Sequence, residues 1–414
     1  MTSQRTEAGR ASTLAAVAHS QLVDSRAAGQ EAARAALDRL GRADCSLVFL
    51  YATAAHDPVL LQAGVRDVVG NDARVVGGQT VGVITSDRVA EEGFEVGVAV
   101  LAAGTLEVRA AMEPDVSKGE FDAGRRLAHA LTREAPIPHD AVLLLTYDIV
   151  LQQTGTVWSM NLAGPFLDGM SSALPDWPTV IGGGMTGDNN FSLAVQWADD
   201  HVATDAAMGV VISGGLRADT TILHGCAPTS RYHTVTRAEG VEVIEIDGRP
   251  ALDVIYEVVG PNAASDIESF PMMLTLGVNH GDLYGQFREE DYVICVCRGV
   301  DTERRRLVMY NDDLVEGTQV QLMRRHIDFD DVRARTRQLV ERLDGRKPVL
   351  ALYADCWARR SVMCGTNGED AEIVRQALGD DVPLLGFYVG SEITRVGGRA
   401  RATNYTGLLT ILSE

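Results

Sequence analysis

One short segment near the C-terminus combines residue types that often do chemistry. Cys356 is followed closely by Arg359 and Arg360, and neighbouring guanidinium groups favour the thiolate form of a cysteine. An arginine here could equally bind a ligand or act as a structural ion-pair partner, and we favour the arginine because no general base for Cys356 can be located from sequence. Glu392 could pair with that arginine, hold a ligand amine or cap local backbone. Cys356 is the one candidate catalytic residue.

Glycine turns form the second feature with binding potential. Three apolar runs, 75–82, 180–187 and 384–390, break at glycines with a shared G-x-x-x-G spacing. Glycine permits a close backbone approach, which a ligand can exploit through exposed amides, although a tight turn needs the same residue. Polar residues follow two of the turns, so a shared pocket is the hypothesis. The candidate ligand-binding residues are Gly78, Gly82, Gly183, Asp188, Asn189, Cys356, Arg359, Gly386, Tyr388 and Glu392.

Histidine and cysteine spacing bears on metals and haem. The nine histidines include no H-E-x-x-H or H-x-H pair, which argues against a zinc hydrolase. Cys295 and Cys297 would share one strand face, and without a second ligand pair they are interpreted as small buried hydrophobes. His224 is either a hydrogen-bonded turn residue or an axial haem ligand, and without C-x-x-C-H any haem would be noncovalent. No cofactor is predicted, and haem stays an alternative.

Nucleotide and serine-hydrolase motifs are not supported. Residues 182–187 match the letters of G-x-G-x-x-G, but the segment 191–197 after them alternates like a strand, whereas a dinucleotide fingerprint opens a helix. A Walker motif is missing, and Ser159 and Ser361 lie outside any G-x-S-x-G elbow. Nucleotide-dependent catalysis is therefore disfavoured.

The elements that position these residues recur three times. Amphipathic helices are predicted at 27–40, 120–134 and 329–343, followed by buried strands at 45–51, 141–147 and 349–353 that all end in tyrosine. Each copy then has a second helix, the glycine-broken strand and a closing strand. The predicted fold is α/β, with mixed sheets covered by helices and internal helix-strand-helix-strand-strand repeats. An ordinary α/β rhythm is the competing interpretation.

The segment from about 219 to 328 interrupts this rhythm. It contains one helical stretch, 251–259, and strands near 292–298 and 306–310, which indicate an additional strand-rich unit. We therefore predict two domains with a boundary near residue 220. The predicted divisions are a flexible N-terminus at 1–25, an N-terminal domain at 26–220 and a C-terminal domain at 221–414.

Composition limits the class of partner. A formal net charge of −20 disfavours nucleic acid and anionic membrane surfaces, since the longest basic cluster is only 304–306. Residues 1–22 lack the apolar run of a signal peptide, and no window reaches the ~18 apolar residues of a membrane span. Six cysteines are too few for a disulfide scaffold. We predict a cytoplasmic protein.

Ordered motifs along most of the chain resemble the FIST N and FIST C families. The N-terminal resemblance lies in residues 77–82, 180–188 and 207–213, and the C-terminal resemblance in 224–228, 235–240, 246–254, 315–320, 355–360 and 385–393. The order and spacing of these motifs support the assignment. The chain departs from the family pattern at Gln79, where Cys or Ser is frequent, and at Ala358, which replaces glycine.

The resemblance implies a sensory module that binds a small polar ligand, with amino acids or related metabolites as the proposed class. No kinase, cyclase or receiver segment was found, so the implied output is a separate signalling protein. Two alternatives stay open: a noncovalent haem-binding nitric-oxide sensor, which some family members resemble, and an enzyme that uses Cys356. The oligomeric state is left open.

Overall fold

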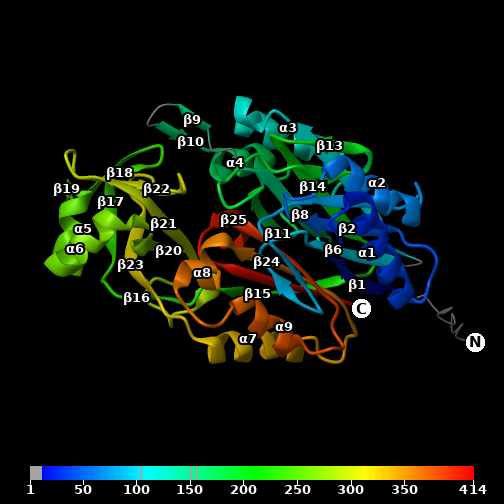
Figure 1. The fold of residues 1–414 in the computed structure, drawn as a ribbon. Coiled ribbons are helices and arrows are strands. Elements are labelled where there is room, and N and C mark those ends of the chain that lie inside the picture. Colours follow the sequence, from blue (N-terminus) through cyan, green and yellow to red (C-terminus); the bar gives the residue numbers. More distant parts are fainter. Residues whose placement is uncertain (1–11, 103–104, 150–151, 155–156) are drawn as a thin grey trace, which may run out of the picture.

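Three structural units of the same build make up most of the chain. The computed structural model describes residues 12–102, 105–149, 152–154 and 157–414. Each unit runs strand, helix, strand, helix, strand, strand (Figure 1). The first unit consists of β1 (Leu14–Ser20), α1 (Ser25–Leu40), β2 (Leu47–Ala52), α2 (Pro58–Val69), β3 (Arg74–Gln79) and β6 (Val96–Ala102).

The other two units repeat this order. The second consists of β7 (Glu107–Pro114), α3 (Glu120–Thr132), β8 (Val142–Asp148), α4 (Ala163–Ala173), β11 (Thr179–Met185) and β14 (Ala206–Ser213). The third consists of β15 (Arg217–Leu223), α7 (Phe329–Glu341), β24 (Pro348–Cys356), α9 (Asp370–Leu378), β25 (Leu384–Val396) and β27 (Gly407–Ser413). The predicted helices and strands are thus confirmed to within a few residues.

Strand pairing shows that the repeat is structural. The sheet order is β1-β6-β2-β3 in the first unit, β7-β14-β8-β11 in the second and β15-β27-β24-β25 in the third. In each unit the closing strand is antiparallel to both of its neighbours, and the strands on either side of the second helix, β2–β3, β8–β11 and β24–β25, are parallel. An ordinary α/β rhythm does not predict three identical orders. The α/β fold with mixed sheets and internal repeats is confirmed.

The third unit carries an insertion between its first strand and its first helix. This inserted unit is a separate eight-stranded sheet with two helices, on the left in Figure 1. It consists of β16 (Cys226–Pro228), β17 (His233–Glu239), β18 (Glu242–Ile246), β19 (Arg249–Pro250), α5 (Ala251–Val259), α6 (Pro261–Ser269), β20 (Thr275–Asn279), β21 (Tyr292–Asp301), β22 (Arg306–Met309) and β23 (Gln319–Arg325). The strand-rich unit and its helix at 251–259 are therefore confirmed.

Each of the three units pairs a strand segment with a strand of another unit. The segment after each glycine-broken strand pairs with the glycine-broken strand of another unit: β4 (Val83–Thr85) pairs with β25, β12 (Gln196–Ala198) pairs with β3, and the end of β25 pairs with β11. The second and third units thereby share one eleven-stranded sheet. The predicted strand over 191–197 is reduced to β12, because residues 188–192 form a turn held by the Asp188 side chain.

Tyr51 and Tyr353 lie opposite the first glycine of their G-x-x-x-G turns, Gly78 and Gly386, whereas Tyr147 lies one position later, opposite Gly184. One sequence expectation needs correction. Residues 14–20, placed in a flexible N-terminus, form β1, which pairs along its whole length with β6. The small apolar side chains of β1 gave little contrast in sequence. Residues 1–11 lie outside the described part of the chain.

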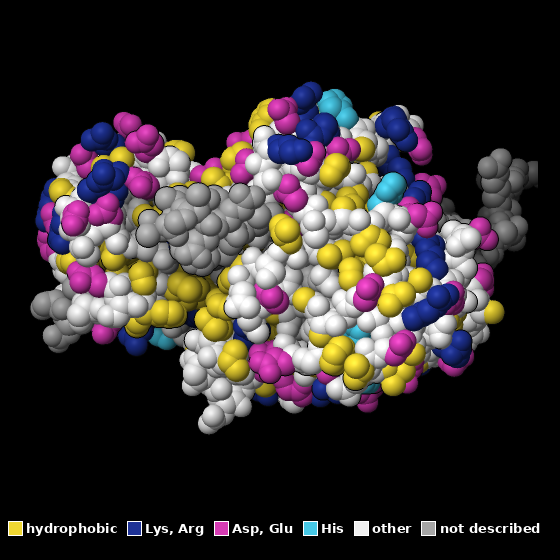
Figure 2. All heavy atoms as spheres, turned by 45° about the horizontal axis from the view of Figure 1, so that its top comes forward, with side chains coloured by type: hydrophobic (Ala, Val, Ile, Leu, Met, Phe, Trp, Pro, Cys, Tyr) yellow, Lys and Arg dark blue, Asp and Glu magenta, His cyan; other side chains and the backbone are white. Residues whose placement is uncertain are grey.

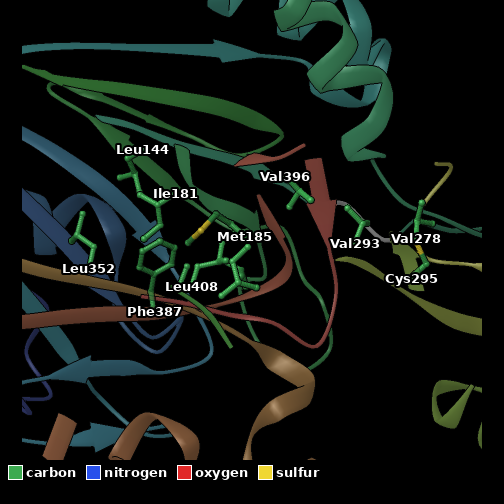
Figure 3. Packing of buried hydrophobic residues seen from close by; sticks show 14 of the residues in the cluster. Leu144, Ile181, Met185, Val278, Val293, Cys295, Leu352, Phe387, Val396 and Leu408 are labelled. Atoms are coloured by element: carbon green, nitrogen blue, oxygen red, sulfur yellow. The ribbon is translucent and has the colours of Figure 1, made fainter. Parts of the chain in front are cut away.

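The units meet at a shared apolar core. Figure 3 shows Ile181 and Met185 of the second unit packed beside Phe387 and Leu408 of the third, all fully buried. The same core continues into the inserted unit, where Cys295 is buried. Full burial of one such apolar side chain stabilises the folded state by roughly 1.5–3 kcal/mol. Within the described residues, no helix is long and apolar enough to span a membrane.

Candidate functional site

The three glycine turns lie together in space. The Thr80 hydroxyl donates a hydrogen bond to the Tyr388 carbonyl (2.9 Å) and accepts one from the Tyr388 amide (3.0 Å). A Cβ on Gly78 would lie 3.1 Å from the Met185 methyl group. The predicted convergence of turns from all three units is therefore present in the structure.

The glycines at these turns pack against protein backbone. A Cβ on Gly82, Gly183 or Gly386 would collide with the carbonyl oxygen of Ala90, Ser391 or Tyr353, respectively. These three glycines and Gly78 are buried, and none of the four lines the cleft or the small cavity described below. Their close approach is to neighbouring strands, as glycines inside sheets often show.

Arg359 is held in a buried network of ion pairs. Its side chain is 2% exposed, and its Nε lies 2.8 Å from Asp355 Oδ1 while its Nη2 lies 2.6 Å from Asp370 Oδ2. Nη1 donates to the Tyr405 carbonyl (3.2 Å). Burial raises the pKa of Asp355 to about 7, against the opposing effect of Arg359. All three guanidinium nitrogens have protein partners, which is the geometry of a structural ion-pair partner.

Cys356 lies in an environment that disfavours the thiolate. Its side chain is buried beside the Glu392 carboxyl group, and burial raises the pKa of both groups well above their usual ranges. Glu392 Oε2 accepts the Thr406 amide (3.0 Å). Desolvation acts against the charged form of either group. A neutral thiol is a weak nucleophile.

We expect thiol labelling to separate the six cysteines by burial. Cys45 and Cys364 are partly exposed, whereas the other four are buried. A soluble disulfide reagent at pH 8 should therefore modify about two thiols in the folded protein. Of these, Cys364 should react first, because burial raises the pKa of Cys45 to about 11. Full labelling in denaturant is the control, and rapid modification of Cys356 in the folded state would contradict this account.

Asn189 contacts the Arg360 segment across two units. Asn189 Oδ1 accepts hydrogen bonds from Arg360 Nη2 (2.8 Å) and Trp357 Nε1 (3.1 Å). The Arg360 guanidinium also lies 5.2 Å from the Trp357 ring centroid. Asp188 instead holds its own turn through the Asn190 and Ser192 amides. The sequence predicts Asn189 and Arg359 in one pocket. In the structure Asn189 does contact this segment, but its partner is Arg360 rather than Arg359.

Two carboxyl groups flank Tyr388. The Tyr388 hydroxyl donates to Glu369 Oε1 (3.2 Å), and Arg360 Nη1 lies 3.7 Å from Glu91 Oε2. Burial raises the pKa of Glu369 to about 7 and also raises the pKa of Glu91. Tyr388 is therefore tied into a buried polar cluster.

Both ring nitrogens of His224 are engaged by protein groups, so neither is free to bind haem iron. Its Nδ1 accepts the Cys226 amide (2.8 Å), and its Nε2 lies 3.1 Å from the Glu289 carbonyl oxygen, which fixes the proton on Nε2. Burial lowers the pKa of this imidazole to about 3. The residues around His224 therefore do not fit an axial iron ligand, and the turn-residue interpretation matches the geometry. No group of three or more metal-ligating side chains was found among the described residues.

A cleft of about 1040 Å³ borders this network. It lies along the outer strand β15, between helix α7 and the loop that enters the inserted sheet. Arg359 and Asp370 are part of its lining, so the buried ion pairs border on it. Its charged lining side chains are Arg288, Arg325, Arg335, Arg342, Arg359, Arg395, Glu289, Glu290, Asp328, Asp331 and Asp370.

The charges of this cleft nearly balance, unlike those of the whole chain at −20. Several are paired: Arg325 Nη2 lies 3.0 Å from Asp370 Oδ2, and Arg335 Nη1 lies 2.9 Å from Glu289 Oε2. Arg325 Nε is buried without a hydrogen-bond partner among the described residues. An unpartnered buried donor calls for an explanation, and a ligand or water is the usual one. Elsewhere, on the face drawn in Figure 2, basic and acidic side chains are interspersed.

A small apolar cavity lies on the other side of the same segment. It measures about 30 Å³ and is lined by Cys356, Trp357, Phe191 and Tyr405, among others. Phe191 (φ 55°) and Tyr405 (φ 51°) both adopt left-handed backbone conformations. Such conformations cost about 1–3 kcal/mol for bulky residues. The segment 355–360 therefore separates a polar cleft from an apolar cavity with strained aromatic walls.

Sequence reasoning missed the partners of this segment. Asp370 lies at the start of α9 and Arg325 at the end of β23, and nothing in the local sequence distinguishes them from surface charges. Trp357 carried a usable signal, since a tryptophan beside two arginines suggests a cation–π contact. The cleft itself needed β15, α7 and the inserted unit to be placed together.

Comparisons with known proteins agree with the family motifs. The FIST N domain family matches residues 46–249, and the FIST C domain family matches residues 251–395. An uncharacterised protein of Mycobacterium bovis is 26% identical over 238 residues, which are 57% of this chain and 60% of that protein. An uncharacterised protein of Methanocaldococcus jannaschii is 25% identical over 216 residues, 49% of this chain and 39% of that protein.

The matches thus span about 60% or less of the curated relatives. Among solved structures, a cyanuric acid hydrolase from A. caulinodans covers 97% of this chain and 99% of its own, at 10% identity and a TM-score of 0.39. That score is too low to carry weight here. The two domain matches cover most of the chain, which therefore belongs to the FIST family, whose domains are generally sensory and signal-transduction domains that bind small ligands.

Proposed function

We propose that this protein senses a small polar ligand that binds in the cleft along β15. The observation that carries the proposal is the unpartnered Arg325 Nε at a cleft of about 1040 Å³. That volume is at the upper end for small-molecule sites. A guanidinium N–H on the cleft lining suits a carboxylate or another oxyanion.

The balance of charges favours a ligand with groups of both signs. Arg395 is exposed, and Asp331 presents a carboxyl group to the same cleft. Amino acids and related metabolites fit this pattern, because they carry both an anionic and a cationic group. Amino acids or related metabolites are thus the proposed ligands, and the cleft is their proposed site.

The response would pass through the segment 355–360. Arg359 reaches the cleft, whereas Trp357 and Cys356 line the apolar cavity behind it. A ligand carboxylate that engages Arg325 competes with the Asp370 carboxylate, which Arg325 shares with Arg359. A changed balance there would alter the face presented to a separate signalling protein. Such a switch requires different ligand affinities for the two arrangements.

We expect ligand binding to depend on an open cleft. Gln338 is exposed on α7 and lines the cleft, whereas its neighbour Arg337 is exposed outside it. Gln338→Trp should fill the space and abolish the rise in melting temperature that the wild type shows in a thermal-shift screen of amino acids and related polar metabolites. Arg337→Trp is the matched control and should respond like the wild type. An equal response from Gln338→Trp would refute the cleft as the site.

A further inference from the structure

The inserted unit contains a histidine–carboxylate pair that the proposed function does not use. His233 is 5% exposed, and its Nδ1 lies 2.8 Å from Asp247 Oδ2. Asp247 Oδ1 accepts the Thr234 amide (2.9 Å), so the carboxylate is fixed on both oxygens. Asp247 adopts a left-handed conformation (φ 53°) at the turn after β18. An ionised carboxylate in this position fixes the imidazole proton on Nδ1.

The other ring nitrogen of His233 is left as a bare acceptor. His233 Nε2 is buried and has no hydrogen-bond partner among the described residues. A neutral imidazole with its proton on Nδ1 can only accept at Nε2. Leaving a buried acceptor unsatisfied destabilises the folded protein. A donor group from outside the chain would recover that free energy.

His233 lines a cavity of about 390 Å³ between α5, the start of β17 and the β18–β19 turn. Arg231 and Arg249 stand at its edge, with side chains that are 74% and 53% exposed. Each guanidinium has five N–H groups, and only some of them are used by Asp247, Glu257 and the Tyr232 carbonyl. His233, with its bare Nε2 acceptor, and the two cationic side chains therefore line the same cavity.

These requirements select a particular chemical class. A ligand must donate one hydrogen bond to Nε2 and also present anionic oxygens to guanidinium groups. We propose that this cavity binds a protonated oxyanion, namely hydrogen phosphate or the monoprotonated phosphate group of a monoester. The P–OH group donates to His233 Nε2, and the remaining oxygens accept from Arg231 and Arg249. Val254 and Val258 provide an apolar wall for the organic part of a monoester.

Sulfate is the decisive comparison. It has nearly the size and shape of hydrogen phosphate but carries no O–H group at neutral pH, so a bare acceptor would face a sulfate oxygen without a proton between them. We therefore expect calorimetric titration at pH 8 to show saturable binding of inorganic phosphate, with sulfate at least about tenfold weaker, a difference of about 1.4 kcal/mol. Phenyl phosphate tests the monoester arm at pH 6, where about half of it carries the P–OH group, and tighter binding than inorganic phosphate at that pH would identify the monoester as the better ligand.

Three variants sharpen the test. His233→Gln should lower phosphate affinity and remove the discrimination against sulfate. Glu257→Gln should raise phosphate affinity, because it removes a carboxylate that competes for Arg249. Arg237→Gln breaks the exposed pair with Glu245 outside the cavity and is the control. Equal binding of sulfate and phosphate, or no phosphate binding even at tens of millimolar, would overturn the proposal. The sulfate comparison and Glu257→Gln keep it testable if His233→Gln does not fold.

Discussion

Gly182→Ala is expected to destabilise the folded protein by roughly 3–5 kcal/mol, a large effect for one methyl group. Gly182 lies in β11 at the centre of the eleven-stranded sheet, between Leu145 of β8 and Ile393 of β25. Its φ of 152° is one that L side chains rarely adopt, and a Cβ there would overlap the carbonyl oxygen of Leu145. Backbone cannot move aside cheaply inside a sheet paired on both edges.

Urea denaturation measures this effect, with Gly299→Ala as the matched control. Gly299 also lies in a strand, but a Cβ there would meet nothing within 4 Å, and its φ is not in the left-handed range. The control should stay within about 0.5 kcal/mol of the wild type. Similar stabilities for the two variants would show that the close strand approach at Gly182 is not required.

Arg359→Met is expected to cost about 3–5 kcal/mol, since it leaves the buried Asp355 carboxyl group without a cation and leaves Asp370 with Arg325 alone. Asp355 and Asp370 are 0% and 4% exposed and both bond to this guanidinium. Methionine keeps much of the side-chain volume, so the loss reports on charge and hydrogen bonding rather than on a cavity. The measurement is again the free energy of unfolding at pH 8.

Two further variants complete this test. Arg399→Met breaks an exposed pair with Asp168, whose side chains are 56% and 66% exposed, and should cost no more than about 1 kcal/mol. Adding Asp355→Asn to Arg359→Met should restore part of the lost stability, because it removes the uncompensated charge, whereas Asp370 keeps Arg325 as its partner. A cost for Arg359→Met no larger than that of Arg399→Met would contradict the structural role assigned to Arg359.

The repeated fold was largely predictable because its signals are local. Helical periodicity and continuous apolar strands located the first helix of each unit, the strand after it and the helix at 251–259 to within a few residues, but the opening strands β1, β7 and β15 were not predicted. Strand exchange between units left no such signal, since β4 and β12 are only three residues long. The strand register could not be predicted from the terminal tyrosines, because Tyr147 is offset by one position from Tyr51 and Tyr353.

The candidate site was predictable only in part. The motif at 355–360 pointed to the right segment, and the turns do meet, through Thr80 and Tyr388. Glycine type alone could not separate packing from ligand contact, and the structure places protein backbone where a ligand had been expected. Partners such as Asp370 depend on how α9 packs, which residue types do not encode. The domain division at 220 and the cytoplasmic location stay predictions.

The central claim is that the ligand occupies the cleft along β15. Hydrogen–deuterium exchange of the full chain, with and without the compound that gives the largest thermal shift, tests it most directly. We predict slower exchange in residues 324–342 and 286–290, which line the cleft, and unchanged exchange in α1. Protection confined to the glycine turns at 78–82 and 183–189, with the cleft unaffected, would contradict the account.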